Sequence, residues 1–185
     1  MKSILTTFLV LLVVHVFCST ATAQTSAELP SPYEFKLIDS ADLSKDELFT
    51  RARAWVAYIC TNANNAIKMD DRGAGKIIFK GAHGAAGYKA GNISFTCTID
   101  VKEHKYRITL TEFSHVGKWN GSNFIDGGPL DSDVPNHKGI LGITMGDWKT
   151  MRRGEANQAN LMMTSFNEAV KNNTQVKAKN SNDGF

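Results

Sequence analysis

The chain contains only one long apolar run and three cysteines, and its charges are nearly balanced. The apolar run, Ile4–Phe17, is too short to span a bilayer and no second run follows, so we expect no transmembrane segment in the mature chain. The net charge is +3, or +2 without Lys2, which argues against a nucleic-acid partner and against strong attraction to a membrane surface. The sequence therefore predicts neither a membrane protein nor a nucleic-acid-binding protein.

The first 23 residues have the composition of a secretory signal peptide. Lys2 supplies the positive end, Ile4–Phe17 the apolar core, and Ala21–Ala23 the small residues of a cleavage site. Cleavage there removes 23 of the 185 residues and leaves 162, a size that suits one domain. Lipid attachment at Cys18 is the weaker alternative, because a bulky residue precedes that cysteine. We predict export to the periplasm or the outer cell surface.

Cys60 and Cys97 are the cysteines that remain after cleavage. Two cysteines do not make a disulfide scaffold, but export would allow a bond between them. Such a bond would contribute roughly 4 kcal/mol if it formed without strain. The alternative is that both are free thiols packed as small apolar residues.

The segment Ser44–Asn64 is predicted to be an amphipathic helix that covers a sheet. Ser44 and Glu47 have the S-x-x-E spacing of a capping box. Asparagines near the end of the segment favour termination there. The apolar stripe recurs at helical spacing and consists of Leu48, Ala52, Trp55, Val56, Ile59 and Cys60.

The strands are predicted from alternation of apolar and polar residues. The clearest example is Asn92–Val101, in which every odd position is apolar and every even position is polar. The other predicted strands are Tyr33–Leu37, Ala66–Asp70 (with Ile67 and Met69 on one face), Lys76–Lys80 and Tyr106–Thr111, and Gly81–Gly91 is expected to be a loop. A second helix is expected from Asp147 to about Lys171.

These elements predict an α+β domain in the order strand, helix, four strands, helix, with two helices on one face of an antiparallel sheet of about five strands. The domain spans residues 33–171 and includes a long irregular loop at 119–146. A linker at 24–32 precedes it, and a polar tail at 172–185, expected to be disordered, follows it.

Several of these stretches resemble a domain family of unknown function, DUF4468. The helix sequence SKDELFTRARAW at Ser44–Trp55 carries most of the resemblance, and Gly75–Ile77, Phe95–Ile99 and Lys105–Arg107 add to it. The resemblance covers roughly Tyr33–Phe113. It implies a TBP-like fold and an exported protein of a gram-negative bacterium. It implies no activity, cofactor or catalytic residue.

The polar face of the sheet, which we call the open face, is the first candidate for a binding surface. Lysine, arginine and threonine side chains alternate onto it, which would suit an envelope protein, a glycan or another small ligand. Exposed sheets also carry such residues for solvation alone. The residues predicted to bind are Lys68, Lys80, Thr96, Thr98, Arg107 and Thr109.

Two alternatives remain, and neither requires a cofactor. One is a carrier that holds an apolar or lipid-like ligand between helices and sheet, lined by Trp148 and methionines of the last helix. The other is a hydrolase with His115, Asp126, Asp131 and His137 in or beside the long loop. The histidines lack the spacing of metal ligands, so we predict no metal site, and a non-catalytic binding module is the leading interpretation.

Overall fold

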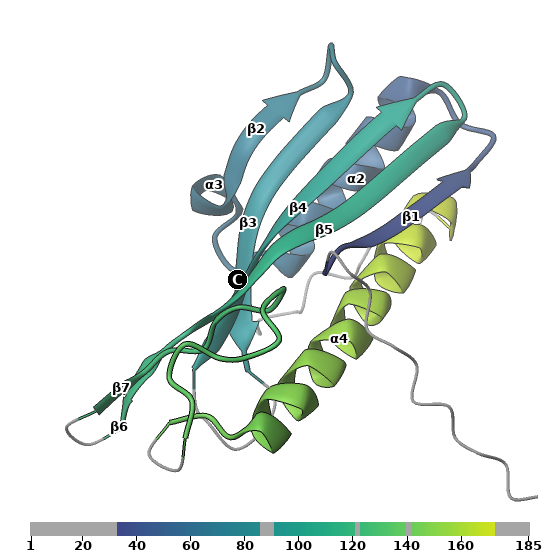
Figure 1. The fold of residues 1–185 in the computed structure, drawn as a ribbon. Coiled ribbons are helices and arrows are strands. Elements are labelled where there is room, and N and C mark those ends of the chain that lie inside the picture. Colours follow the sequence, from purple (N-terminus) through teal and green to yellow (C-terminus); the bar gives the residue numbers. More distant parts are fainter. Residues whose placement is uncertain (1–32, 86–90, 121–122, 140–141, 173–185) are drawn as a thin grey trace, which may run out of the picture.

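The computed structural model describes residues 33–85, 91–120, 123–139 and 142–172 (Figure 1). The predicted signal peptide, the predicted linker and nearly all of the predicted tail lie outside these residues, so the expectations about them stay predictions. No helix in the described part of the chain is long and apolar enough to cross a membrane.

The main sheet has six antiparallel strands in the order β1-β5-β4-β3-β2, with the short β8 paired to the end of β5. A separate hairpin is formed by β6 (Lys118–Asn120) and β7 (Asn123–Ile125). The strands of the main sheet are β1 (Phe35–Ser40), β2 (Ile67–Asp71), β3 (Lys76–Gly84), β4 (Asn92–Lys102), β5 (Lys105–Val116) and β8 (Gly128–Pro129).

Strict alternation in β4 determines which face of the sheet is buried. Its odd positions from Ile93 to Val101 are buried, and its even positions are half-buried or exposed. The neighbouring strands β3 and β5 have the same pattern, because paired residues point to the same face. Cys97 of β4 pairs with Phe79 of β3 on one side and with Leu110 of β5 on the other. One face therefore belongs to the core and the other is the open face.

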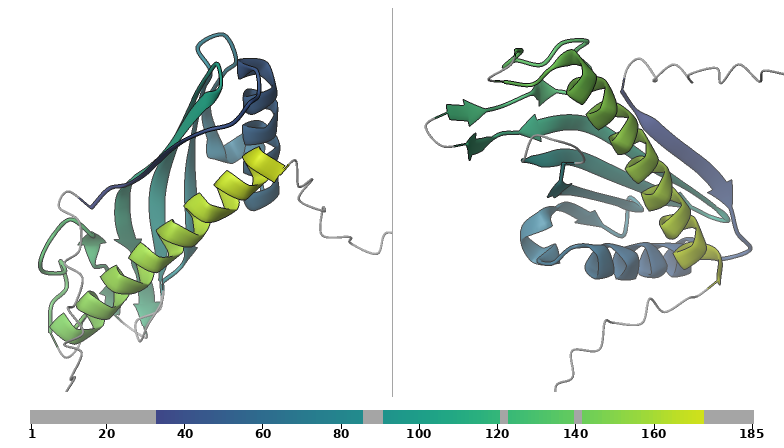
Figure 2. Two further views of the ribbon diagram at one scale, coloured as in Figure 1. Left: turned by 90° about the vertical axis from the view of Figure 1, so that its right-hand side faces the viewer. Right: turned by 90° about the horizontal axis from the view of Figure 1, so that it is seen from below.

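Both long helices lie on the core face of the sheet (Figures 1 and 2). Helix α2 (Lys45–Ile59) begins at Ser44, whose Oγ accepts a hydrogen bond from the Glu47 N–H at 3.2 Å, as the capping sequence predicts. Trp55 lies at its centre, buried against Phe79 and Phe166. Helix α2 ends at Ile59, and the one-turn helix α3 (Ala63–Ala66) follows.

Helix α4 (Met145–Asn172) runs without interruption through Gly154. Thr144 and Asp147 form its N-terminal cap, with the Asp147 N–H donating to the Thr144 Oγ1 at 3.2 Å. At its other end the Arg51 Nη1 donates to the Val170 carbonyl at 2.7 Å, and Lys171 pairs with Asp39 at 2.6 Å. Helix α2 and strand β1 thus hold the C-terminal end of α4 in place.

The predicted α+β class and order of elements are confirmed, but four details were wrong. The first helix ends at Ile59 instead of near Asn64, because Cys60 is extended and α3 is a separate turn. Strand β3 continues to Gly84 instead of ending at Lys80, because Gly81–Gly84 pair with β4 despite their small side chains. A register shift between Ile67 and Met69 turns Met69 toward the open face, opposite Ile78. The segment 119–146 is not wholly irregular, since it contains β7 and β8.

Candidate functional site

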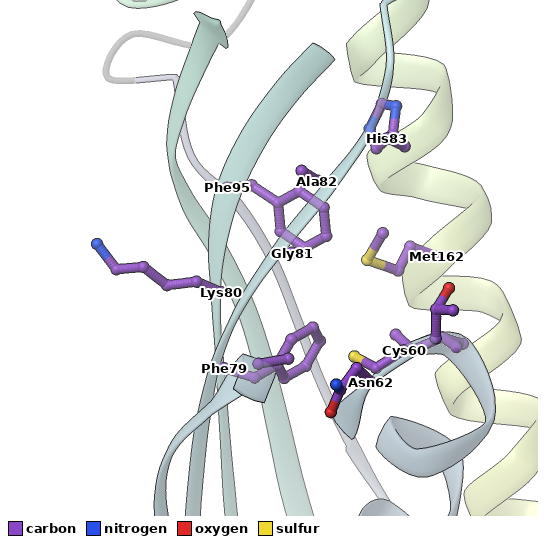
Figure 3. Close-up of a pocket in the computed structure, with 12 residues that line it drawn as sticks. Cys60, Asn62, Phe79, Lys80, Gly81, Ala82, His83, Phe95 and Met162 are labelled. Carbon is purple, nitrogen blue, oxygen red and sulfur yellow. The ribbon is translucent and has the colours of Figure 1, made fainter. Parts of the chain in front are cut away.

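A pocket of about 270 Å³ lies on the core side of β3, where the sheet, the α2–α3 connection and α4 meet (Figure 3). Its interior is apolar, since the side chains of Phe79, Phe95 and Met162 point into it. Asn62 and His83 add polar atoms at its margin. An apolar space with a few polar groups at its edge is the usual composition of a small-ligand site.

The pocket exists because the surrounding elements leave its volume unfilled. Gly81 faces the helices between Phe79 and His83 and contributes no side chain, and a Cβ atom added there would meet the Phe95 ring. On the opposite side, α2 stops at Ile59, and Cys60 is already extended, with ψ 119°. Met162 of α4 closes the remaining side.

An ion pair between a partly exposed histidine and a buried glutamate borders the pocket. The His83 Nε2 lies 3.0 Å from the Glu155 Oε1, and the Glu155 side chain is only 3% exposed, whereas that of His83 is 29% exposed. The hydrogen bond to Glu155 raises the pKa of His83 above its usual value, against the opposing effect of burial. The pocket margin therefore presents a histidine held in its charged form to higher pH than usual.

The two cysteines are free thiols, so the disulfide that the sequence allowed is not formed in the structure. Cys97 is buried under the helices as expected, whereas Cys60 is half-buried and lines the pocket instead of lying wholly in the core. Burial raises the pKa of both thiols, which keeps them protonated and poorly nucleophilic.

On the open face the structure brings together most of the predicted residues. Lys80 pairs with Thr96 across β3 and β4, and Thr98 pairs with Thr109 across β4 and β5. Arg107 lies farther along β5, opposite Asp100. Lys68 falls in the β2 bulge, where its Nζ donates to the Asn65 carbonyl at 2.9 Å.

Two of the three predicted cations of the open face are already paired with carboxylates, whereas Lys68 forms no ion pair among the described residues. Arg107 contacts Asp100 at 2.7 Å, and Lys80 lies 3.5 Å from Glu112. Glu112 also accepts a hydrogen bond from Thr96 at 2.6 Å, which together with Lys80 lowers the pKa of its carboxyl group. The open face is thus less basic than the sequence suggested.

The sequence pattern did not predict Glu112 on the open face, because this residue reaches the face through a β-bulge. Its φ of 55° is in the left-handed region, and the β4–β5 register shifts between Ser94 and Thr96 at the same level. Alternation alone would place Thr111 and Glu112 on opposite faces, and no local sequence signal marks the extra residue.

The residues proposed for a hydrolase lie close together, but they bind backbone groups. The His115 Nδ1 accepts from the Gly127 N–H at 2.9 Å, and the Asp126 carboxylate accepts from the Gly128 N–H at 3.0 Å. The His137 Nδ1 lies 2.8 Å from the Asp126 carbonyl, and Asp131 accepts from the Tyr33 N–H at 2.7 Å. His115 is 1% exposed, and burial lowers its pKa. These contacts hold the loop against the sheet.

Metal-ligating side chains do not gather anywhere in the described ranges. No group of three or more histidine, cysteine, aspartate or glutamate side chains there has the geometry to hold an ion. Of the residues of the last helix that were predicted to line a cavity, only Met162 lines the pocket, while Trp148 and Met151 belong to the core.

An open antiparallel sheet with helices on one face, and a small pocket under its edge, defines an open-faced α+β domain. Residues 35–116 match the model of a family described as a domain of unknown function (DUF4468) with TBP-like fold. This segment of the chain belongs to that family, as its sequence indicated. No curated protein matches the chain.

Solved structures with a similar fold support this assignment. A DUF4468 family protein from Bacteroides ovatus ATCC 8483 aligns with a TM-score of 0.53 and 12% identity, over 74% of this chain and 85% of the other. A TBP-like protein from Parabacteroides distasonis ATCC 8503 aligns with a TM-score of 0.55 and 12% identity, over 73% of this chain and 92% of the other. At this level of identity the likeness concerns the fold alone.

Proposed function

We propose that this protein is a non-catalytic binding module whose site is the pocket between β3, the α2–α3 connection and α4. The observation that carries the proposal is the pocket itself, with Phe79, Phe95 and Met162 around an unfilled volume of about 270 Å³. Apolar groups that leave water for such a space gain about 25 cal/mol per Å² of buried surface. The ligand is therefore an apolar group.

The volume limits the size of that group. Sites for drug-sized molecules usually measure about 300–1,000 Å³, so this pocket is below the lower end of that range. It suits one aromatic ring or one branched aliphatic side chain and is too small for a whole lipid. The proposal thus keeps the apolar-ligand alternative and restricts it to a small ligand or to one anchoring group of a larger one.

The open face is a weaker site because two of its three predicted cations are already paired within the protein. Arg107 and Lys80 would have to leave Asp100 and Glu112 to bind an anionic ligand. The prediction that the open face is the contact surface can be tested with Lys80→Glu and Arg107→Glu. If it is correct, both variants should remain folded and lose binding of the ligand or partner.

A binding role agrees with the chemistry of the reactive groups near the pocket. Burial keeps the Cys60 thiol protonated, and the pair His83–Glu155 has no nucleophile bonded to it among the described residues. We propose further that the module acts after export, in the periplasm or at the cell surface, on the strength of its signal-peptide sequence.

Filling the pocket should abolish binding of a small apolar probe. Indole, titrated into the protein and followed by two-dimensional NMR, is expected to shift the amides of Ala82 and Phe95 saturably, with a dissociation constant on the order of 1 mM for so small a ligand. Met162→Trp places a large side chain in the pocket, and we expect it to weaken indole binding at least tenfold.

Leu161→Trp is the matched control, because Leu161 is the neighbouring residue on α4 and is 62% exposed. This variant should bind indole like the wild type. The proposal is wrong if indole causes no saturable shifts around the pocket, or if Met162→Trp, shown to be folded, binds it unchanged.

A further inference from the structure

The edge of β3 beside the pocket lacks a strand partner over half of its length. Strand β3 pairs with β4 along its whole length, from Lys76 to Gly84. On its other side β2 pairs with it only as far as Phe79. Within the described ranges no strand pairs with Lys80–Gly84 on that side.

The register shows which backbone groups this edge exposes. The Val101 N–H donates to the Gly75 carbonyl at 2.7 Å, and the Ala85 N–H donates to the Gly91 carbonyl at 2.9 Å. Bonding residues alternate along an antiparallel ladder, so the odd residues between 75 and 85 bond to β4. The even residues, Ala82 and Gly84 above all, direct their N–H and C=O groups to the unpaired edge.

The pocket opens at this same edge. Lys80, Gly81, Ala82 and His83 line it from β3, and Figure 3 shows Gly81 beside the space into which Phe95 and Met162 point. A residue paired with Gly81 on the unpaired side would direct its side chain to the same face as Gly81, and thus into the pocket. The Phe95 ring occupies the space over Gly81 itself, so the room for that side chain is the adjoining pocket of about 270 Å³.

We propose that an extended segment of a partner polypeptide adds to the sheet along Lys80–Gly84 and places one apolar side chain, opposite Gly81, in the pocket. The proposal rests on the proposed function and identifies the source of the apolar group. Strand addition of this kind takes its affinity from main-chain hydrogen bonds and its specificity from side-chain pockets. A row of backbone donors and acceptors at strand spacing is complementary to another extended backbone and not to a compact small molecule.

The charges at one end of the site indicate what should follow the apolar residue. In an antiparallel pairing, the next residue of the partner lies opposite Lys80, whose side chain is 63% exposed on the open face and 3.5 Å from Glu112, so an acidic partner residue would share this cation with Glu112. Lys68 is at the bulge where β2 meets β3, and it forms no ion pair among the described residues. An acidic residue directly after the anchor therefore complements this end of the edge.

The experiment uses the peptide acetyl-TTTFE-amide, in which phenylalanine is placed opposite Gly81 and glutamate opposite Lys80, and which ends before Phe79, where Ile67 of β2 is already paired. We expect a dissociation constant of about 0.1–1 mM by NMR titration and slowed amide exchange at Ala82 and Gly84. Methylating the backbone nitrogens of the third and fifth residues, which face β3, should weaken binding at least tenfold. Methylating the nitrogen of phenylalanine, which faces away, should weaken it less than threefold.

A protein variant tests the same contact from the other side. Gly84→Pro removes an N–H that does not bond to β4, at a residue that does not line the pocket, so the fold should persist and peptide binding should fall at least tenfold, while indole binding is retained. Gly84→Ala is the matched control, because a Cβ atom there meets nothing within 4 Å and the N–H remains. This variant should bind the peptide like the wild type.

Each other outcome identifies what failed. Equal binding of the peptide methylated at its third and fifth nitrogens overturns strand addition and leaves the pocket intact. Indole binding without peptide binding overturns the partner polypeptide alone, and the absence of both overturns the proposed function as well. Concentration-dependent protection of Ala82 and Gly84 without peptide, together with dimers in sedimentation, would assign the edge to a second copy and overturn the proposal of a different partner.

Discussion

Replacing Trp55 by alanine is expected to lower the free energy of unfolding by about 4 kcal/mol, because it opens a cavity at the centre of the core. Trp55 is 1% exposed and lies with its ring centroid 5.1 Å from that of Phe166 and 6.2 Å from that of Phe79. Its Nε1–H donates to the Ser165 Oγ at 3.1 Å, so the substitution also removes a bond between α2 and α4. Urea denaturation of the purified protein measures the change.

Tyr58→Ala on the same helix is the control, since Tyr58 is 51% exposed. It should change the stability by no more than about 0.5 kcal/mol. Trp55→Phe should fall between the two, because it keeps an aromatic ring, leaves a smaller cavity and removes the bond to Ser165. If Trp55→Ala lowers the free energy of unfolding by less than about 1 kcal/mol, the Trp55 side chain is not a major contributor to the stability of the core.

Removing the imidazole of His83 is expected to destabilise the protein by about 2 kcal/mol at pH 6 and by clearly less at pH 8.5. The variant His83→Ala leaves the 3%-exposed Glu155 carboxylate without its cation. Breaking a fully buried pair typically costs about 3–5 kcal/mol, and the partial exposure of His83 reduces that figure. The pH dependence follows from linkage: the folded pKa of His83 is raised above its ordinary value of about 6.5.

A raised pKa means that the stabilisation by the pair is complete below about pH 6.5 and is lost as the pH rises through the folded value. His115 contributes with the opposite sign. Burial lowers its pKa, so the stability it contributes declines as the pH falls below about 6.5. The difference between wild type and His83→Ala therefore isolates His83 better than the wild-type profile does.

The control for this prediction is Glu155→Gln, which keeps a hydrogen-bonding group beside His83 and removes the charge. In that background His83→Ala should cost a similar amount at pH 6 and pH 8.5. If His83→Ala in the wild-type background also costs the same at both pH values, the side chain acts through packing and its charge contributes nothing.

The sequence predicted those parts of the fold that depend on local patterns. Alternation in Ile93–Val101 identified β4 and its buried face, and the spacing of Ser44 and Glu47 identified the start of α2. Both signals are contained in a few consecutive residues, so they needed no information on the rest of the chain. The family resemblance added the fold type, which the comparisons confirm.

The pocket could not be predicted because its walls come from segments far apart in the sequence. Gly81 and its neighbours form strand only because β4 pairs with them, and their small side chains give no alternation to detect. The ion pair at the pocket margin joins residues 72 positions apart. The bulge at Glu112 adds a backbone irregularity that alternation cannot reveal. Each of these features depends on tertiary contacts.

Met162 and Glu155 lie on α4, the last helix of the chain, so the pocket forms only when this helix has docked. Strands β2 to β5 pair with their neighbours in the sequence, whereas Arg51 meets Val170 across 119 positions. Closing so long a segment is slow and follows the local hairpins. The pocket is thus complete only when the last helix docks, and in stopped-flow refolding we expect indole binding to develop with the slowest phase.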